Sequence, residues 1–181
     1  MIKFSEEQKR NPHGLMGKLI LRRMDKVHYD LASFAFSQIT IKPDFNILDL
    51  GCGSGLNIKR MNEMTPTGRV DGLDLSILSA KTSKRRNHRA IKKNKTKIYN
   101  ASILDIAIPN NSKDLITAFC TIRMWDDLDK AILKILAVLK PNGTFLIGDY
   151  GRYDVNNMCS FIKSLGFSEV KNVRKDSYNN I

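Results

Sequence analysis

Cysteine is scarce in this sequence: Cys52, Cys120 and Cys159 are widely spaced, and no Cys-x-x-Cys pair occurs. We therefore expect neither a disulfide framework nor a metal site, and we expect the protein to work in a reducing cytoplasm. Long hydrophobic runs are also missing. No apolar run approaches the ~20 residues that span a bilayer, so no transmembrane segment is expected. The N-terminal residues lack the apolar core of a signal peptide.

Acidic residues are absent from residues 81–97, a segment that holds nine Lys or Arg residues. The whole chain has a net charge of +12, and outside this segment only 21 basic residues face 18 acidic ones. Such a run is typical of a nucleic-acid or anionic surface, or of a solvated helix face. No aromatic residue is interleaved with the charges, as stacking on single-stranded nucleic acid would require. We favour the solvated face and keep nucleic acid as an alternative partner.

Three glycines at every second position follow a short apolar stretch, in the order Ile47-Leu48-Asp49-Leu50-Gly51-Cys52-Gly53-Ser54-Gly55. The apolar run is typical of a strand buried on both faces, and a helical pattern begins at Leu56. Glycines in this position allow a sharp turn and a close approach of a ligand to the backbone. A nicotinamide fingerprint would need its third glycine at position 56, which is a leucine. The stretch therefore predicts a ligand loop of another class.

Strands and helices alternate along the rest of the chain, which predicts an α/β fold with a doubly wound, mainly parallel sheet. A chain of 181 residues fits one domain. Residues 1–44 show one or two amphipathic helices that should form an N-terminal helical cap, and residues 45–181 should form the ligand-binding part. The strands are expected at residues 47–50, 69–75, 97–102, 114–120, 144–149 and 169–175. The helices are expected at residues 56–64, from Ser76 onward, at 127–139 and at 155–165.

Asp74 ends the second expected strand, 23 residues after Gly51. An acid at this place in a nucleoside-binding sheet accepts hydrogen bonds from both ribose hydroxyls, because an ionised carboxylate is acceptor-only with two oxygens. The alternative is an ordinary aspartate at a strand end. Loop and acid together favour a nucleoside cofactor.

Residues 47–55 and 70–76 resemble motif I and the ribose-acid segment of class I S-adenosylmethionine-dependent methyltransferases. Residues 101–114 are similar to the adenine-side loop of that family. Residues 133–149 resemble the ubiquinone/menaquinone-biosynthesis type. The resemblance implies S-adenosylmethionine as the cofactor and a seventh strand, which in this chain is at most a stub at residues 177–181.

The resemblance also implies roles for individual residues. The methionine part of the cofactor would be held by Asp49 and the backbone of Gly51, Cys52, Gly53 and Gly55. Asp74 would hold the ribose, with Leu75 against the adenine and the N–H of Ile103 facing an adenine nitrogen. The carbonyls near Phe119 and Cys120 would face the methionine ammonium. Ser102 stands where the family usually has an acid that accepts from the adenine amino group.

The expected activity is in-line methyl transfer to a small-molecule acceptor. An RNA or ribonucleoprotein acceptor, docked through residues 81–97, and a non-catalytic cofactor-binding module are the alternatives. The short connection at residues 150–154 either leaves the N-terminal helices as the only lid or leaves the site open to a large acceptor. Candidates for a general base are His28, Asp149 and Tyr150. Candidates for contacts with the acceptor are His28, Tyr29, Arg123, Trp125, Tyr150 and Tyr153. The acceptor atom and the oligomeric state are left open.

Overall fold

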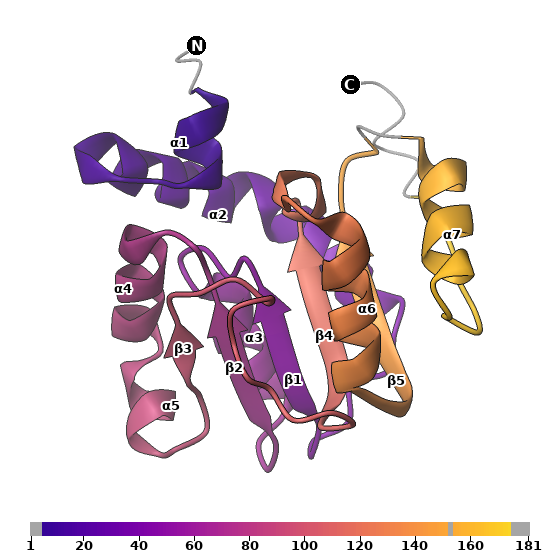
Figure 1. The fold of residues 1–181 in the computed structure, drawn as a ribbon. Helices are drawn as coiled ribbons and strands as arrows, with labels where there is room; N and C mark the ends of the chain where they lie inside the picture. The colour runs from indigo at the N-terminus through magenta and orange to yellow at the C-terminus, as the bar shows by residue number, and fades with distance from the viewer. Residues whose placement is uncertain (1–4, 152–153, 175–181) are drawn as a thin grey trace.

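A five-stranded parallel sheet forms the centre of the computed structural model, which describes residues 5–151 and 154–174 (Figure 1). The strand order is β3-β2-β1-β4-β5, and every neighbouring pair is parallel. The bounds are Asn46–Leu50 for β1, Arg69–Leu73 for β2, Ile98–Tyr99 for β3, Lys113–Phe119 for β4 and Leu139–Gly148 for β5. The predicted doubly wound α/β fold is confirmed. The chain reverses its direction of winding between β1 and β4, and such switch points are where ligands bind in sheets of this kind.

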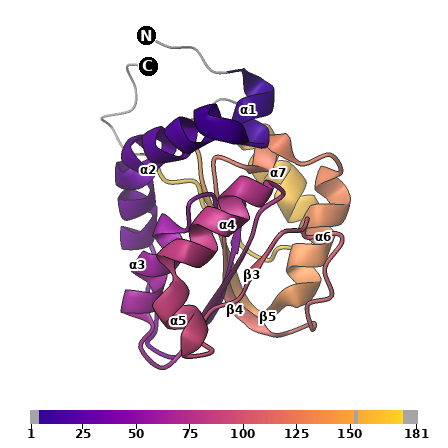
Figure 2. The ribbon, with the colours of Figure 1, turned by 90° about the vertical axis from the view of Figure 1, so that its left-hand side faces the viewer.

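Helices cover both faces of the sheet, as two views at right angles show (Figures 1 and 2). Their bounds are Glu6–Arg10 for α1, Gly14–Ser37 for α2, Leu56–Met64 for α3, Ile77–Arg86 for α4, His88–Lys92 for α5, Leu128–Val138 for α6 and Val155–Ser164 for α7, with a 3₁₀ turn, η1, at Ile122–Met124. None of the described helices is long and apolar enough to cross a bilayer.

Alternating side chains of the strands build two separate cores. Ile47 and Leu115 point to the face that α3 and the second half of α2 cover, where Phe36 packs with them. Leu48 and Ile116 point to the other face, against the apolar side of α6. All four strand residues are fully buried. Because parallel strands are buried on both faces, they form near-continuous apolar runs, as this sequence has.

The long helix α2 has two differently placed halves. Its second half packs on the sheet through the buried residues Leu31, Ala32, Ala35 and Phe36. Its first half, with α1, crosses above the carboxyl ends of the strands (Figures 1 and 2). The predicted N-terminal helices therefore lie over the edge of the sheet where the glycine loop begins.

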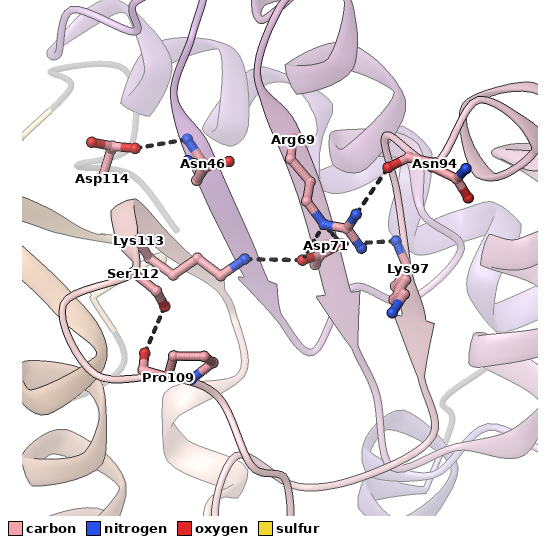
Figure 3. Close-up of polar contacts among 9 residues, drawn as sticks. All are labelled: Asn46, Arg69, Asp71, Asn94, Lys97, Pro109, Ser112, Lys113 and Asp114. Atoms are coloured by element: carbon pink, nitrogen blue, oxygen red, sulfur yellow. Dashed lines mark hydrogen bonds and ion pairs between the residues drawn. The ribbon is translucent and has the colours of Figure 1, made fainter.

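A buried ion-pair network joins the amino ends of the strands, at the opposite edge of the sheet from the glycine loop (Figure 3). Lys113 on β4 places its Nζ 2.9 Å from a carboxylate oxygen of Asp71 on β2, with both side chains less than a tenth exposed. Arg69 and the backbone N–H of Lys97 also donate to Asp71. Burial alone would raise the pKa of Asp71, but the hydrogen bond from Arg69 and the charge of Lys113 lower it. The network ties β2 to β4 across the intervening β1.

Two sequence predictions need correction. The sixth strand predicted at residues 169–175 is wrong over its described part, residues 169–174, which pair with no neighbouring strand and are almost all exposed. A strand is stable only when a neighbour satisfies its backbone groups, and the alternating pattern alone does not supply one. The third strand is also shorter than predicted, because only Ile98 and Tyr99 pair with β2. The predicted stub at residues 177–181 lies outside the described residues.

The helix predicted to follow Ser76 begins as expected and is interrupted ten residues later. The Ser76 hydroxyl accepts a hydrogen bond from the Ser79 N–H at 3.1 Å, which caps α4. Asn87 ends α4, and its side-chain amide donates to the carbonyls of Gly55 and Ser83. The basic residues 81–97 therefore lie on two short helices, α4 and α5, and on the loop that leads to β3.

Candidate functional site

A cavity of about 360 Å³ lies at the carboxyl ends of β1, β2 and β4. This volume is typical of a small-molecule site, which is usually concave and mostly apolar with a few placed polar groups. From the sheet side it is lined by the glycine loop, the ends of β2 and β4 and the loop after β3. From the other side it is lined by α1 and by residues of α2 that include Leu21, Met24 and His28.

The backbone of the glycine loop is left-handed at each of its three glycines, a conformation that favours glycine over residues with a side chain. The amides of Gly51 and Cys52 donate to the Leu73 carbonyl at 2.9 and 3.0 Å, so they hold the loop to β2. A Cβ on Gly51 would overlap the side chain of Thr121. A Cβ on Gly53 would meet only Leu21, at 3.9 Å. Gly53 therefore leaves its backbone open to the cavity.

Gly55 has a packing role that the sequence did not distinguish from ligand contact. It caps the start of α3 with φ of +77°, and a Cβ there would overlap the Ser83 hydroxyl and the Asn87 amide of the neighbouring helices. Its carbonyl accepts from Asn87 at 3.0 Å. Gly55 is not among the residues that line the cavity. In this structure it allows α3 and α4 to approach each other closely.

Asp74 is held in place by the backbone at the carboxyl end of β2. One of its oxygens accepts from the Gly53 N–H and the other from the Ser76 N–H, each at 2.8 Å. Burial raises the pKa of Asp74, and the hydrogen bonds from Ser76 and Gly53 oppose that rise. A carboxylate oxygen has two acceptor positions, so each oxygen can still accept a ligand hydroxyl.

Asp49 is a second buried carboxyl group in the lining, only 2% exposed. The Thr117 hydroxyl of β4 donates to it at 2.6 Å. Burial raises the pKa of Asp49 to about 7, and the nearby charge of Asp74 adds to that rise. Among the described residues, no Lys or Arg pairs with either carboxyl group. These two buried acids thus line the cavity with no Lys or Arg of the described residues paired to them, an environment that fits a positively charged ligand.

All the predicted cofactor residues except Gly55 line this cavity. They are Asp49, Gly51, Cys52, Gly53, Asp74, Leu75, Ser102, Ile103, Phe119 and Cys120. Leu75 is half exposed, whereas Ile103 is buried. Ser102 already accepts a hydrogen bond from the Leu104 N–H at 2.9 Å. Burial raises the pKa of the Cys52 thiol well above its usual value, so this thiol stays protonated.

Some of the residues predicted to contact the acceptor or to act as a general base line the cavity, and others lie outside it. His28, Tyr29 and Trp125 line the cavity. Asp149 and Arg123 lie outside the lining and pair with each other at 3.7 Å, with the Asp149 side chain only 3% exposed.

Tyr150 also lies outside the lining. Its hydroxyl donates to the Val27 carbonyl of α2 at 2.7 Å, and its ring lies 5.8 Å from that of His28. Tyr153 lies outside the described residues. Of the three candidates for a general base, only His28 borders the cavity.

A polar cluster that sequence reasoning missed ties α2 to the glycine loop. Asp25 of α2 accepts from the Ser54 hydroxyl and pairs with Arg86 of α4, whose Nη2 lies 2.8 Å from its carboxylate. Arg86 also donates to Ser54. A second tie joins Arg10 of α1 to Asp126 after η1. These partners are far apart in sequence, and the only available signal was the serine inside the glycine loop.

Residues 48–147 match the family model described as a methyltransferase domain. The chain belongs to this family. The match covers β1 to β5, and therefore the strand ends that form the cavity. Among the described residues, no group of three or more His, Cys, Asp or Glu could hold a metal ion.

Two curated methyltransferases resemble the chain over about three fifths of its length. A 2-phytyl-1,4-naphthoquinone methyltransferase of Nostoc is 31% identical over 112 residues, which are 61% of this chain and 49% of that protein. A demethylmenaquinone methyltransferase of Symbiobacterium thermophilum is 28% identical over 111 residues, 61% of this chain and 44% of that protein. The chain thus spans about half the length of these relatives.

The methyltransferase fold is also found in a solved structure that matches most of the chain. A structure of an S-adenosylmethionine-dependent methyltransferase from Aquifex aeolicus gives a TM-score of 0.70 at 16% identity, covering 81% of this chain and 86% of that one. At this identity the likeness establishes the fold.

Proposed function

We propose that this methyltransferase domain binds S-adenosylmethionine in the cavity and transfers its methyl group to a small-molecule acceptor. One observation carries the proposal: Asp49 and Asp74 are buried beside an open glycine backbone, and no cation of the described residues neutralises them. S-adenosylmethionine carries an ammonium and a sulfonium, so it would supply the missing positive charge. A positive charge beside Asp49 would lower the pKa of its carboxyl group and so oppose the effect of burial.

The residues of the cavity fit the parts of this cofactor. Asp74 would accept both ribose hydroxyls, because the Gly53 and Ser76 amides fix its orientation and leave one acceptor position on each oxygen. Leu75 and Ile103 would pack against the adenine. Asp49 would attract the ammonium, and the open backbone at Gly53 would allow close approach.

The cofactor supplies a methyl group already activated by its sulfonium. The protein then has two tasks, which are to align the acceptor and to exclude water. Helices α1 and α2 would perform the second task, since residues of both line the cavity from above. His28 and Tyr29 of α2 and Trp125 after η1 would contact the acceptor. His28 is the residue best placed to take up a proton if the acceptor loses one.

The acceptor class we propose is an apolar ring compound of the quinone type. Two curated relatives are named as methyltransferases of naphthoquinones and of demethylmenaquinone. The apolar lining of this cavity, which includes Leu21, Met24 and Trp125, supports an acceptor with little charge. An RNA acceptor is not favoured, since none of Lys81, Lys84, Arg85 and Arg89 lines the cavity. The cytoplasm is the compartment we propose, because Cys52, Cys120 and Cys159 form no disulfide bond within the described part of the chain.

Methyl transfer from S-adenosylmethionine with a labelled methyl group tests this function. The purified chain would be incubated with reduced demethylated quinones, and separately with fractions of lysate enriched in RNA, protein, lipid and small molecules. We expect the label in the quinone and lipid fractions, and loss of transfer in Asp74→Ala. Label that enters only RNA or protein would refute the acceptor class. Absence of transfer to any fraction would refute catalysis by this chain.

A further inference from the structure

The outer face of α2, the helix that roofs the cavity, combines exposed leucines with cations. Leu15 is 79% exposed and Leu19 is 51% exposed. Both lie on the opposite side of the helix from the buried residues Gly17, Ile20 and Leu21. At helical spacing the same outer side carries the exposed residues Lys18, Arg22 and Lys26. We call these five residues, Leu15, Lys18, Leu19, Arg22 and Lys26, the outer face of α2.

The charges of this face are available to a partner. Among the described residues, Lys18, Arg22 and Lys26 take part in no ion pair. Asp25, the acid nearest in sequence, is turned toward Ser54 and Arg86 and is engaged there. The next acid of the helix, Asp30, comes one turn after Lys26 and marks the end of the cationic stretch.

The opposite face of the same half of α2 belongs to the cavity. Leu21, Met24 and His28 of this helix line it. A single helix, about 10–12 Å across with its side chains, therefore separates the cavity from the outer face. Whatever binds the outer face lies next to the roof of the site.

We propose that the outer face of α2 docks on the surface of an anionic lipid bilayer. A basic helix face with interspersed leucines is the pattern of helices that lie in the membrane interface, where cations meet anionic headgroups and apolar side chains enter the acyl boundary. Each Lys or Arg near such a surface adds attraction, and each buried leucine adds apolar transfer. Nucleic acid would use the cations but would leave the two leucines in water, so it fits this face less well.

Docking in this orientation gives an apolar acceptor a short route to the site. A quinone-type acceptor with a long hydrocarbon chain dissolves in the bilayer, and the roof helix would lie at that surface. This consequence rests on the proposed function, whereas the docking surface itself does not.

The chain offers a matched control for charge alone. Helices α4 and α5 carry the exposed cations Lys84, Arg85 and Arg89, and no exposed large hydrophobic residue lies among them. Replacing these three by glutamine changes the net charge by the same amount as replacing Lys18, Arg22 and Lys26. A purely electrostatic attraction would respond to both changes alike.

Vesicle sedimentation with the full chain tests the proposal. The probes are vesicles of phosphatidylcholine, vesicles of equimolar phosphatidylcholine and phosphatidylglycerol, and a single-stranded RNA oligonucleotide. The variants are Leu15→Gln with Leu19→Gln, Lys18→Gln with Arg22→Gln and Lys26→Gln, and the α4–α5 control Lys84→Gln with Arg85→Gln and Arg89→Gln. All the replaced side chains are exposed, and circular dichroism melting checks that each variant keeps its fold.

We expect binding to the anionic vesicles, with a fall of about tenfold or more in partitioning for both outer-face variants and a smaller fall for the α4–α5 control. Three results would overturn the proposal: no preference for anionic over neutral vesicles, unchanged partitioning of the leucine variant, or a control that falls as far as the outer-face variants. Binding to RNA alone, lost in the α4–α5 control, would assign the charge to nucleic acid instead. Because vesicle binding needs no turnover, this test is separate from the test of methyl transfer.

Discussion

Replacing Asp49 by asparagine should stabilise the free protein at high pH while it weakens cofactor binding. Asp49 is 2% exposed, and burial raises its pKa to about 7 from an ordinary value of 3.8. An asparagine keeps an oxygen that can accept from Thr117, the partner that now donates at 2.6 Å. The substitution therefore removes the titration and keeps the contact.

The sign follows from the direction of the pKa change. The folded state holds the Asp49 proton more tightly than the unfolded chain, so this group favours folding most where the proton is bound. Its contribution is complete below about pH 4 and is lost as the pH rises to about 7. Between pH 5 and pH 8 the loss corresponds to about two pKa units, or about 3 kcal/mol. No discount for solvent screening is needed, because the side chain is buried.

Urea denaturation of the wild type and of Asp49→Asn at several pH values between 5 and 8 measures this effect. The difference between the two proteins isolates Asp49, since all other titrating groups are shared. We expect the variant to gain up to about 3 kcal/mol relative to the wild type over this range. A difference that stays constant with pH would show that Asp49 ionises freely, and the charge argument for the site would be wrong.

Further substitutions separate the roles of other residues. Gly53→Ala should weaken cofactor binding, measured by calorimetry, and its positive φ alone should lower the free energy of unfolding by about 1–2 kcal/mol. The Gly55→Ala variant should unfold at a clearly lower urea concentration than the wild type, because the added Cβ overlaps neighbouring side chains. Lys113→Ala should lower the free energy of unfolding by about 3 kcal/mol in urea denaturation, because the buried carboxylate of Asp71 loses one of its ion-pair partners. The double variant that also carries Asp71→Leu should recover part of that loss, since it removes the buried charge. The α4–α5 control variant should keep nearly full methyl-transfer activity in the assay, and a large loss at unchanged cofactor affinity would favour an RNA acceptor.

Much of the sheet could be predicted from the sequence because its signals are local. Composition and spacing alone predict a strand from Ile47 to Leu50, a ligand loop at the glycines that follow, and the end of the next strand at Asp74. Parallel strands buried on both faces must be apolar, and a turn with positive φ favours glycine. The position of the cavity then followed from topology, because the strand ends meet at one edge of the sheet.

Other features could not be predicted because they depend on contacts between distant residues. Gly55 has the same sequence signature as Gly53, yet it is required by the approach of Ser83 and Asn87. Whether residues 169–174 pair as a strand depends on a neighbour that the local pattern does not specify. The charged network of Asp71 and Lys113 links positions 42 residues apart. Likewise, nothing near Arg86 in the basic segment shows that it faces Asp25 of α2.

Calorimetric titration of S-adenosylmethionine into the wild type and into Asp74→Ala tests most directly whether the cavity binds this cofactor. The substitution removes the carboxylate that would accept two hydrogen bonds from the ribose. Each hydrogen bond to a charged group contributes about 1.5–3 kcal/mol at most to binding. We expect binding at one site in the wild type and an affinity reduced by at least about tenfold in the variant, with the fold of both checked by circular dichroism. Equal affinity in the two proteins, or no binding to the wild type, would contradict this expectation.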